Sequence, residues 1–511
     1  MPHSVSSNDS PKRDSEDEIL PDAPPESGGA NGTETDKAVV KLEDLFNDDD
    51  DDDEFPASSA ADSKTASSPP AAALPSAPPT SGVDTDTMLA FYQRLFPFRY
   101  IFQWLNHGIV PSPDFGNREF ALTLQNDAYL RYQSYPTADL FRKDILKMNP
   151  SRFEIGPVYS TNPRDRKTLR GGQMKPVSKE LVFDIDLTDY DDIRTCCEKA
   201  NICAKCWAFV TVAIKVVDTA LREDFGFEHI MWVYSGRRGA HAWVCDQRAR
   251  QLPDDRRRAI ASYLDIVRGG DKSGKRVNLK RPLHPHVSRS IEILKPYFAQ
   301  TTLVDQDTFA SSEQAERLLS LLPDKTLVEA LRKKWESAPE RSSTSKWTDI
   351  DALAKTVKGL NPTALRDAKL DIVLEYTYPR LDAEVSKKMI HLLKCPFVVH
   401  PGTGRVCVPI DGRNPEKFDP LSVPTVTELL SEIDEWDAKH PGGIPASDDV
   451  EASAGTDTDA KGGRKLQDYE KTRLKPHIDY FRSFIAGLIK DERSSKRERG
   501  EEGTTTDAME F

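Results

Sequence analysis

"KELVFDIDLTDY", residues 179–190, carries the clearest β-strand pattern in this chain of 511 residues. Large apolar residues occupy every second position from Leu181 to Leu187, and Asp184 and Asp186 fall between them. Because successive side chains of a strand point to opposite faces, the apolar face packs into a core while both carboxylates point the same way. Strand geometry places their Cβ atoms roughly 6–7 Å apart. We therefore expect a core sheet with a pair of acids on its other face.

This acid pair suits divalent metal chemistry. Two carboxylates at such a spacing can bind cations held about 3.5–4 Å apart, which activate a hydroxyl nucleophile and stabilise a leaving pyrophosphate. A bound cation would also relieve the repulsion between two anions among apolar neighbours. The alternative is a strand whose polar face simply meets solvent, because a D-x-D pair by itself is a weak signal.

A small cationic loop follows an apolar run further along the chain. "SGRRGAHAWVCD", residues 235–246, comes directly after "HIMWVYS", and the two stretches predict paired strands around a loop. Gly236 and Gly239 allow a tight turn and close approach of backbone N–H groups to an anion. The side chains that could donate to a triphosphate are Ser235, Arg237, Arg238 and His241. The alternative is a solvated hairpin tip with surface charges, but a nearby metal-binding strand favours a phosphate site.

A second cationic segment is "LDAEVSKKMIHLLKCPFVVHP", residues 381–401. We expect a helix here, with Val385, Met389 and Leu392 on one face. Asp382 stands at its start, where it can be a plain N-cap or the third carboxylate of a metal site. Lys394 and His400 follow the helix and add donors.

Four cysteines lie close together in "CCEKANICAKC", at Cys196, Cys197, Cys203 and Cys206. This spacing suits a tetrahedral, structural zinc site, and the alternative is a set of free thiols. The other three cysteines, Cys245, Cys395 and Cys407, lie in apolar stretches and are expected in the core. Without a secretory signal, seven cysteines indicate a reducing compartment.

The net charge of −13 is unevenly distributed. Residues 1–86 hold 21 acids against 5 bases, so the rest of the chain carries 62 acids and 65 bases and is slightly basic. The acidic total therefore does not exclude a nucleic-acid partner for the folded part. The Ser-, Pro- and Asp-rich residues 1–86 predict disorder, and "KAVVKLEDLFNDDDD" within them is either a solvated tail or a motif that folds on binding. No apolar run is long enough to predict a membrane span.

Changes in pattern divide the chain into five parts. We expect a disordered acidic tail over 1–86, a core over 87–304, a helical subdomain over 305–370, completion of the core over 371–440, and a linker, C-terminal helix and charged tail over 441–511. Among the expected local elements are a helix from Met88 broken at Pro97, a hairpin around 125–127, a helix over 207–222, a strand "IVLEYTY" over 372–378 and a last helix over 466–491.

These segments, in this order, resemble the small catalytic subunit of eukaryotic and archaeal DNA primases. The resemblance runs from about Met88 to Asp411 and rests on four stretches: "REFALTLQNDAYLRYQSYP", "KELVFDIDLTDYDDIR", "SGRRGAH" and "RLDAEVSKKMIHLLKCPFVVHPGTGRVCVPID". It implies a mixed α/β, primase-type catalytic fold with mixed sheets, a zinc knuckle at 196–206 and a helical subdomain.

The resemblance also implies roles for individual residues. The implied metal-binding triad is Asp184, Asp186 and Asp382. The implied nucleotide-binding residues are Ser235, Gly236, Arg237, Arg238, Gly239, His241, His391, Lys394 and His400. Glu119 and Arg131 match residues that help in nucleotide binding and initiation, and the implied zinc ligands are Cys196, Cys197, Cys203 and Cys206.

The implied activity is synthesis of short RNA primers from NTPs on single-stranded DNA in the nucleus. Two Mg²⁺ or Mn²⁺ ions and one structural Zn²⁺ are the expected cofactors. The expected partners are a large primase subunit with an iron–sulfur cluster and DNA polymerase α, with no membrane association. The alternatives are a related repair polymerase that extends existing ends and a non-catalytic zinc module that scaffolds replication proteins.

Overall fold

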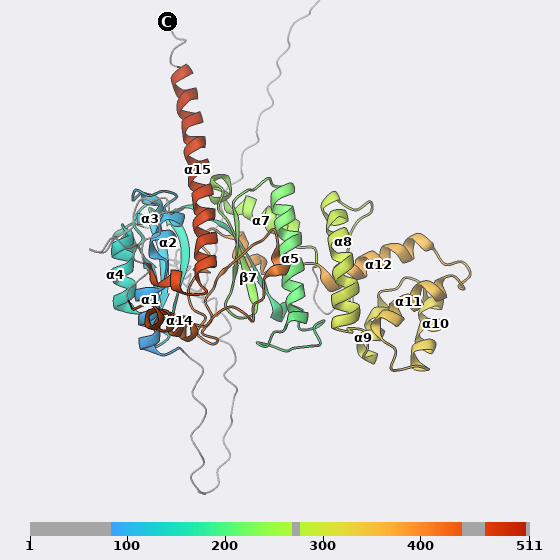
Figure 1. Cartoon of the computed structure of the whole chain (residues 1–511). Helices are drawn as coiled ribbons and strands as arrows, with labels where there is room; N and C mark the ends of the chain where they lie inside the picture. Colours follow the sequence, from blue (N-terminus) through green and yellow to red (C-terminus); the bar gives the residue numbers. More distant parts are fainter. Residues whose placement is uncertain (1–82, 171, 268–275, 442–465, 507–511) are drawn as a thin grey trace, which may run out of the picture. The chain divides into compact units, whose positions relative to one another are not determined.

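The computed structural model describes residues 83–170, 172–267, 276–441 and 466–506, with side chains up to Ser494. Most of the expected acidic tail, its apolar motif and nearly all of the expected linker lie outside the described residues, but α1 (Thr85–Arg94) already begins inside the expected tail. The described part confirms a mixed α/β fold, built on two β-sheets and their covering helices (Figure 1).

The stretch "LVFDID" forms β5, an outer strand of a four-stranded sheet with the order β5-β7-β6-β9. β5 pairs antiparallel with β7 over its whole length, from Leu181 opposite Val244 to Asp186 opposite Gly239. Helix α5 contacts both strands and covers one face with the apolar residues of a core helix, as Figure 1 shows beside β7. The elements of this layer are β5 (Leu181–Asp186), α5 (Ala204–Glu223), β6 (Ile230–Tyr234), β7 (Gly239–Val244) and β9 (Pro409–Ile410).

The other sheet has the order β2-β1-β3-β4, and β8 also pairs with β3. Aromatic residues fill the space between this sheet and the N-terminal helices. The Phe153 ring on β3 lies 5.5 Å from Phe96 and 5.7 Å from Phe141 in edge-to-face contacts. The elements are α1 (Thr85–Arg94), α2 (Phe98–Leu105), α3 (Pro113–Gly116), β1 (Arg118–Thr123), β2 (Tyr129–Gln133), α4 (Ala138–Met148), β3 (Arg152–Tyr159), β4 (Pro176–Ser178) and β8 (Leu393–Lys394).

Several local predictions are confirmed here. The N-terminal helix is interrupted at Pro97, the hairpin turns around 125–127, and the strands on both sides of the cationic loop pair with each other. One detail differs: every strand pair among the described residues is antiparallel, whereas mixed sheets were expected. Hairpins join β1 to β2 and β6 to β7, and a hairpin requires antiparallel pairing.

Helices dominate the described residues between β7 and α13 (Ala383–Lys387), and the sequence predicts a helical subdomain within this region, over 305–370. The prediction of a strand over 372–378 is wrong, because these residues are the last turns of α12. A short, continuous apolar run does not distinguish a buried strand from a buried helix. Here it continues a helix that Asn361 caps at its N-terminus and that packs against α5, α8 and η3. The helices are α6 (Gln247–Arg250), α7 (Asp254–Leu264), α8 (Pro285–Tyr297), η3 (Phe298–Asp305), α9 (Ser312–Ser320), α10 (Lys325–Glu336), α11 (Ser343–Ala354) and α12 (Pro362–Thr377).

The helix expected to extend past Leu392 is much shorter. α13 (Ala383–Lys387) ends where Lys388 adopts an extended conformation, so Met389 and Leu392 lie beyond it. The chain leaves the helix there because Leu393 and Lys394 form β8 and pair with β3.

The C-terminal helix also begins later than expected. A short 3₁₀ turn, η5 (Asp468–Lys471), precedes α15 (Lys475–Thr506). Pro476 lies in the first turn of α15, where its missing N–H costs nothing. Buried residues at helical spacing attach α15 to the body: Ile478, Phe481, Ile485 and Leu488. The remaining elements are η1 (Pro163–Thr168), η2 (Leu187–Tyr190), η4 (Pro415–Lys417) and α14 (Val426–Lys439).

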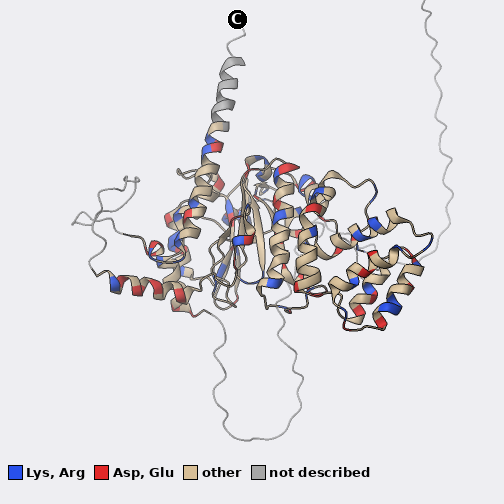
Figure 2. Ribbon diagram, turned by 45° about the vertical axis from the view of Figure 1, so that its right-hand side comes forward, with Lys and Arg blue, Asp and Glu red and all other residues tan. Residues whose placement is uncertain are grey.

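Lys, Arg, Asp and Glu are interspersed along the described elements (Figure 2), in line with the nearly balanced charge of the folded part. Within the described residues, no helix has both the length and the apolar character that crossing a membrane requires.

Candidate active site

Three aspartates from two distant segments meet at one end of β5. Asp184 and Asp186 extend from the same face of the strand. The backbone N–H of Asp382 donates to the carbonyl oxygen of Asp184 at 3.1 Å, so the segment before α13 lies directly beside the strand. Asp382 is also the N-cap of α13, where its Oδ1 accepts from the backbone of Glu384 at 3.0 Å. The cap and the proximity to the acid pair are therefore compatible.

Crowding of the acids changes their proton affinity. Burial and, after it, the charges of Asp186 and Asp382 together raise the pKa of Asp184 to about 7, against the opposing effect of Lys394. Burial, followed by Asp186 and Asp382, also raises the pKa of Asp189 to about 6. A divalent cation would relieve this repulsion, and oxygen donors are the ligands that Mg²⁺ and Mn²⁺ prefer.

The register between β5 and β7 brings the cationic loop to the acids. His241 stands opposite Asp184 and Gly239 opposite Asp186. Both glycines are sterically required: a Cβ on Gly239 would lie 2.2 Å from the carbonyl oxygen of Ile185, and one on Gly236 would lie 2.5 Å from the Cβ of His400. Gly236 also has a φ of +89°, which side chains disfavour. The tight turn is thus part of the site.

Two members of the loop contact the acids directly. Arg238 Nε donates to both carboxylate oxygens of Asp186, at 2.7 and 2.9 Å. His241 Nε2 lies 3.5 Å from Asp184 Oδ1, and burial together with Lys394 lowers the pKa of His241 to about 3. The imidazole is therefore neutral at neutral pH.

The remaining cations gather around His400. Lys394 Nζ donates to the carbonyl oxygen of Ser235 at 3.2 Å, which joins β8 to the loop. Burial lowers the pKa of His400 to about 3, and Lys394 and Arg237 are the charges that contribute most after it, followed by Arg152 and Arg238. Such a concentration of positive charge beside the acids suits an anionic ligand.

Glu119 and Arg131 form a pair of their own in the other sheet. Arg131 Nε donates to Glu119 Oε1 at 3.0 Å, and the hydroxyl of Tyr159 donates to Oε2 at 3.0 Å. The fully buried Glu119 is thus held on β1 by side chains from β2 and β3. His391 is half-buried in the turn between α13 and β8, where its backbone N–H donates to Lys388.

The four cysteines form a compact cluster that could hold a metal such as zinc. Their sulfurs all lie within 4.8 Å of one another. Cys203 Sγ is 3.5 Å from Cys196 Sγ and 3.9 Å from Cys206 Sγ, too far for a disulfide. A tetrahedral zinc with Zn–S bonds of about 2.3 Å holds its sulfurs about 3.8 Å apart, so the observed spacing fits.

Hydrogen bonds favour the thiolate of Cys203, although burial raises the pKa of Cys196 to about 11 and also raises that of Cys197. Although burial disfavours the thiolate of Cys203, hydrogen bonds from the Cys206 backbone and the neighbouring thiols lower its pKa to about 7. Gln306 Nε2 donates to Cys196 Sγ at 3.3 Å and Arg194 Nη1 to Cys206 Sγ at 3.8 Å. Donors of this kind orient metal ligands.

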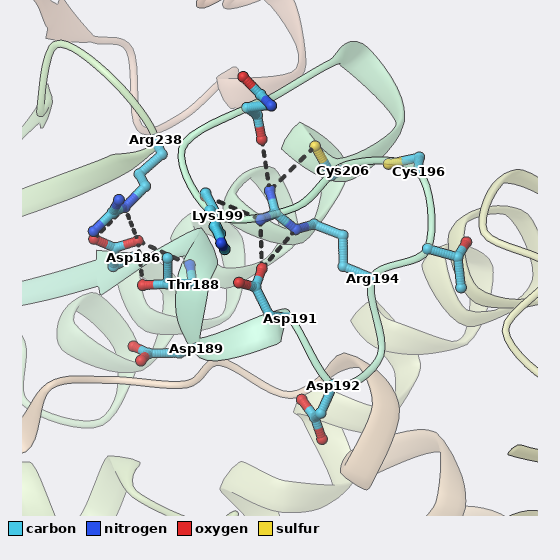
Figure 3. Close-up of polar contacts among 12 residues, drawn as sticks. Asp186, Thr188, Asp189, Asp191, Asp192, Arg194, Cys196, Lys199, Cys206 and Arg238 are labelled. Atoms are coloured by element: carbon cyan, nitrogen blue, oxygen red, sulfur yellow. Dashed lines mark hydrogen bonds and ion pairs between the residues drawn. The ribbon is translucent and has the colours of Figure 1, made fainter. Parts of the chain in front are cut away.

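Arg194 also connects the cysteine cluster to the end of β5. Its guanidinium donates to Asp191 and to the carbonyl oxygens of Lys199 and Asn201 as well as to Cys206 (Figure 3). Asp191 follows η2, which continues directly from Asp186. The knuckle therefore braces the segment that leaves the acid pair.

Comparisons with known proteins agree on one family. The family profile for the DNA primase small subunit matches residues 183–411, which include the three aspartates, the loop and the four cysteines. The chain is 54% identical over 419 residues to the DNA primase small subunit of Schizosaccharomyces pombe, covering 81% of this chain and 92% of the relative. The chain belongs to the DNA primase small subunit family. The chain is 44% identical over 427 residues to the DNA primase small subunit of Saccharomyces cerevisiae, covering 82% of this chain and 96% of the relative. It is 37% identical over 419 residues to that of Drosophila melanogaster, covering 80% of this chain and 92% of the relative.

Two further residues lie near the site of this primase family member, and the sequence alone does not identify them as candidates. Asp189 belongs to the acid-rich run "DLTDYDD" directly after the strand, and that run is the signal that could have identified it. Arg152 opens β3 without any recognisable motif, and only the pairing of β3 with β8 brings it towards Lys394 and His400.

Proposed function

We propose that this chain is the catalytic subunit of a primase that synthesises short RNA primers on single-stranded DNA by nucleotidyl transfer. One observation carries the proposal: Asp184, Asp186 and Asp382 come together at the end of β5 and face the "SGRRGAH" loop. Membership of the primase small subunit family supports the same catalytic role in replication.

The three aspartates are the proposed ligands of two Mg²⁺ or Mn²⁺ ions. Their oxygen donors and mutual repulsion fit such cations, which when bound lower the barrier for attack of a 3′-hydroxyl on an α-phosphate. Arg238 holds Asp186 by both carboxylate oxygens and so fixes its orientation. His241 remains neutral and can donate to Asp184.

The cations beside the acids are the proposed triphosphate site. Lys394, Arg237 and Arg152 lie close enough to His400 for their charges to lower its pKa. Ser235 Oγ accepts from the backbone of Gly239 at 3.0 Å, which leaves its hydroxyl proton available for a phosphate oxygen. Arg can grip phosphate with two parallel hydrogen bonds, whereas Lys supplies a point charge.

A structural Zn²⁺ in the cysteine cluster completes the proposed cofactors. Because all four donors are protein sulfurs, no coordination position is left for a substrate. The proposed partners are a large primase subunit with an iron–sulfur cluster and DNA polymerase α, and the proposed location is the nucleus. The partners and the location are proposed from the resemblance to eukaryotic primases. Two yeast relatives of this chain are named DNA primase small subunits.

Unprimed synthesis tests the proposal. The purified chain, alone and with the large subunit, is given a single-stranded template and NTPs, and short products are resolved on a gel. Product formed without a primer supports a primase. Extension of a supplied 3′ end without any unprimed product would instead indicate a repair polymerase, and no product under either condition would indicate a scaffold.

A further inference from the structure

Arg380 lies two residues before Asp382 and is the main anchor of that segment. Its side chain is 9% exposed. Its guanidinium donates to the Asp192 carboxylate and to the carbonyl oxygen of Asp189, and its backbone N–H donates to the hydroxyl of Tyr190 at 2.9 Å. All three partners belong to the stretch that leaves β5 just after the acid pair.

Asp192 in turn gathers three arginines from separate parts of the chain. Besides Arg380, it accepts from Arg276 Nη1 at 2.8 Å and from Arg317 Nη1 at 3.4 Å. Its backbone carbonyl accepts from Gln314 on α9 at 3.2 Å. Asp192 itself points away from Asp186 in Figure 3 and towards the helical region.

The same arginines reach α12 through a buried acid. Arg317 on α9 donates to Glu375 Oε1 at 3.2 Å, and the backbone N–H of Arg276 donates to Oε2 at 3.4 Å. Glu375 is 1% exposed. We call Asp192, Glu375, Arg276, Arg317 and Arg380 the Asp192 cluster. Its three cations and two anions form a continuous ionic connection from α9 and α12 to the residues on both sides of the carboxylate site.

Asp382 is held from both sides. Its backbone N–H donates to β5, and the five-residue α13 after it is tied to the same strand by Ser386 Oγ, which donates to the carbonyl oxygen of Val182 at 2.6 Å. The segment before it is fixed mainly by Arg380. The planar guanidinium contacts Asp192 and the carbonyl oxygens of Asp189 and Glu375 at once, whereas the single nitrogen of a lysine cannot reproduce that fork.

We propose that Arg380 is a positioning residue that holds Asp382 in place for metal binding, and that the Asp192 cluster couples this third carboxylate to helices α9 and α12. The inference rests on the proposed metal-binding role of Asp382. Outer-shell partners of metal ligands typically contribute about 10–100-fold to metal affinity, so loss of the fork should be measurable.

The test measures Mn²⁺ binding to the purified full chain in the absence of nucleotide, with electron paramagnetic resonance as the readout. We expect Arg380→Lys to raise the Mn²⁺ concentration at half-saturation about tenfold. At saturating Mn²⁺, the KM for NTP should stay close to wild type. Arg341→Lys is the matched control, because Arg341 also pairs with an aspartate shared with a second cation, but within the helical region: Asp349 accepts from both Arg341 and Lys334. Its half-saturation should not change.

Asp382→Asn separates the inference from the proposed function. If Asp382→Asn leaves Mn²⁺ binding intact, the proposed metal site is wrong. If Asp382→Asn weakens binding but Arg380→Lys does not, the metal site stands and the positioning role is wrong. Equal weakening by Arg380→Lys and Arg341→Lys would also overturn it, as a general loss of stability.

Tyr190→Phe keeps the test decisive if Arg380→Lys does not fold. This change removes only the hydroxyl that accepts from the Arg380 backbone and keeps the buried ring. We expect a smaller rise in half-saturation, about threefold, at the low end of the free-energy loss for one hydrogen bond. Unchanged Mn²⁺ binding in folded Tyr190→Phe would contradict the proposal.

Discussion

The cysteine cluster and the aspartate site are both suited to metals, but they are assembled in opposite ways. All four sulfurs come from eleven consecutive residues and lie within 4.8 Å of one another. The third aspartate comes 198 positions after Asp184 and reaches the acid pair through a backbone bridge to that residue. The cysteine cluster is local, as a structural site should be. The aspartate site depends on the whole fold.

The contrast predicts that the two sites fail differently, and the largest expected effect is on catalysis. Asp186→Asn should lower primer synthesis by about a thousandfold, because a bound metal supplies several kcal/mol of charge stabilisation. The zinc content and the melting temperature should remain near wild type. Gel-resolved synthesis rates, zinc analysis and circular dichroism check this. Near-normal synthesis by the folded variant would remove Asp186 from the site.

Loss of one proposed zinc ligand should instead lower the stability of the fold. In Cys203→Ser we expect the zinc content to fall from one to near zero and the melting temperature to drop by several degrees, because structural zinc contributes directly to folding. Atomic absorption and thermal unfolding measure both, with Asp186→Asn as the control that keeps its zinc. Full zinc retention in Cys203→Ser would show that the cluster is not the binding site.

Within the aspartate site, the cationic loop should affect nucleotide binding. Arg237→Ala removes one charged contact to phosphate, so the KM for NTP should rise about tenfold or more. Arg256→Ala, which removes a 73% exposed arginine on α7, is the matched control and should leave the KM unchanged. Steady-state kinetics provide the comparison. A constant KM with weakened template binding would assign the loop to DNA.

Metal binding should also depend on pH, with no effect above about pH 7 and a graded loss below it. The pKa of Asp184 is raised to about 7, mainly by burial and then by Asp186 and Asp382, so below that pH a cation must displace a proton. Mn²⁺ affinity should fall about tenfold for each pH unit below 7 and level off above it. Titrations between pH 5.5 and 8 measure this, and a flat profile would contradict the crowded acid site.

The comparison also shows what could be predicted from sequence. Local periodicity predicts β5 and its acidic face. Apolar residues alternate from Leu181 to Leu187, and Asp184 and Asp186 lie between them. The cysteine cluster is equally local. The bond from Arg238 to Asp186 and the approach of Arg152 depend on strand register and on β3–β8 pairing, which no short motif encodes.

Errors in the helical region have a related cause. "IVLEYTY" is mostly apolar and all seven of its residues are buried, so its sequence shows no helical period. The short α13 ends where β8 begins to pair with β3, a tertiary requirement that overrides the helical pattern past Lys387. Asp382 was placed in the site by resemblance, since its local sequence explains it equally well as a cap.

The most direct measurement of the central claim is anomalous diffraction at the Mn edge from crystals with Mn²⁺ and a non-reactive NTP analogue. The account predicts strong anomalous peaks among the carboxylates of Asp184, Asp186 and Asp382, with the triphosphate against Arg237, Lys394 and His400. Peaks elsewhere, or a nucleotide bound away from the loop while these carboxylates hold no ion, would contradict it.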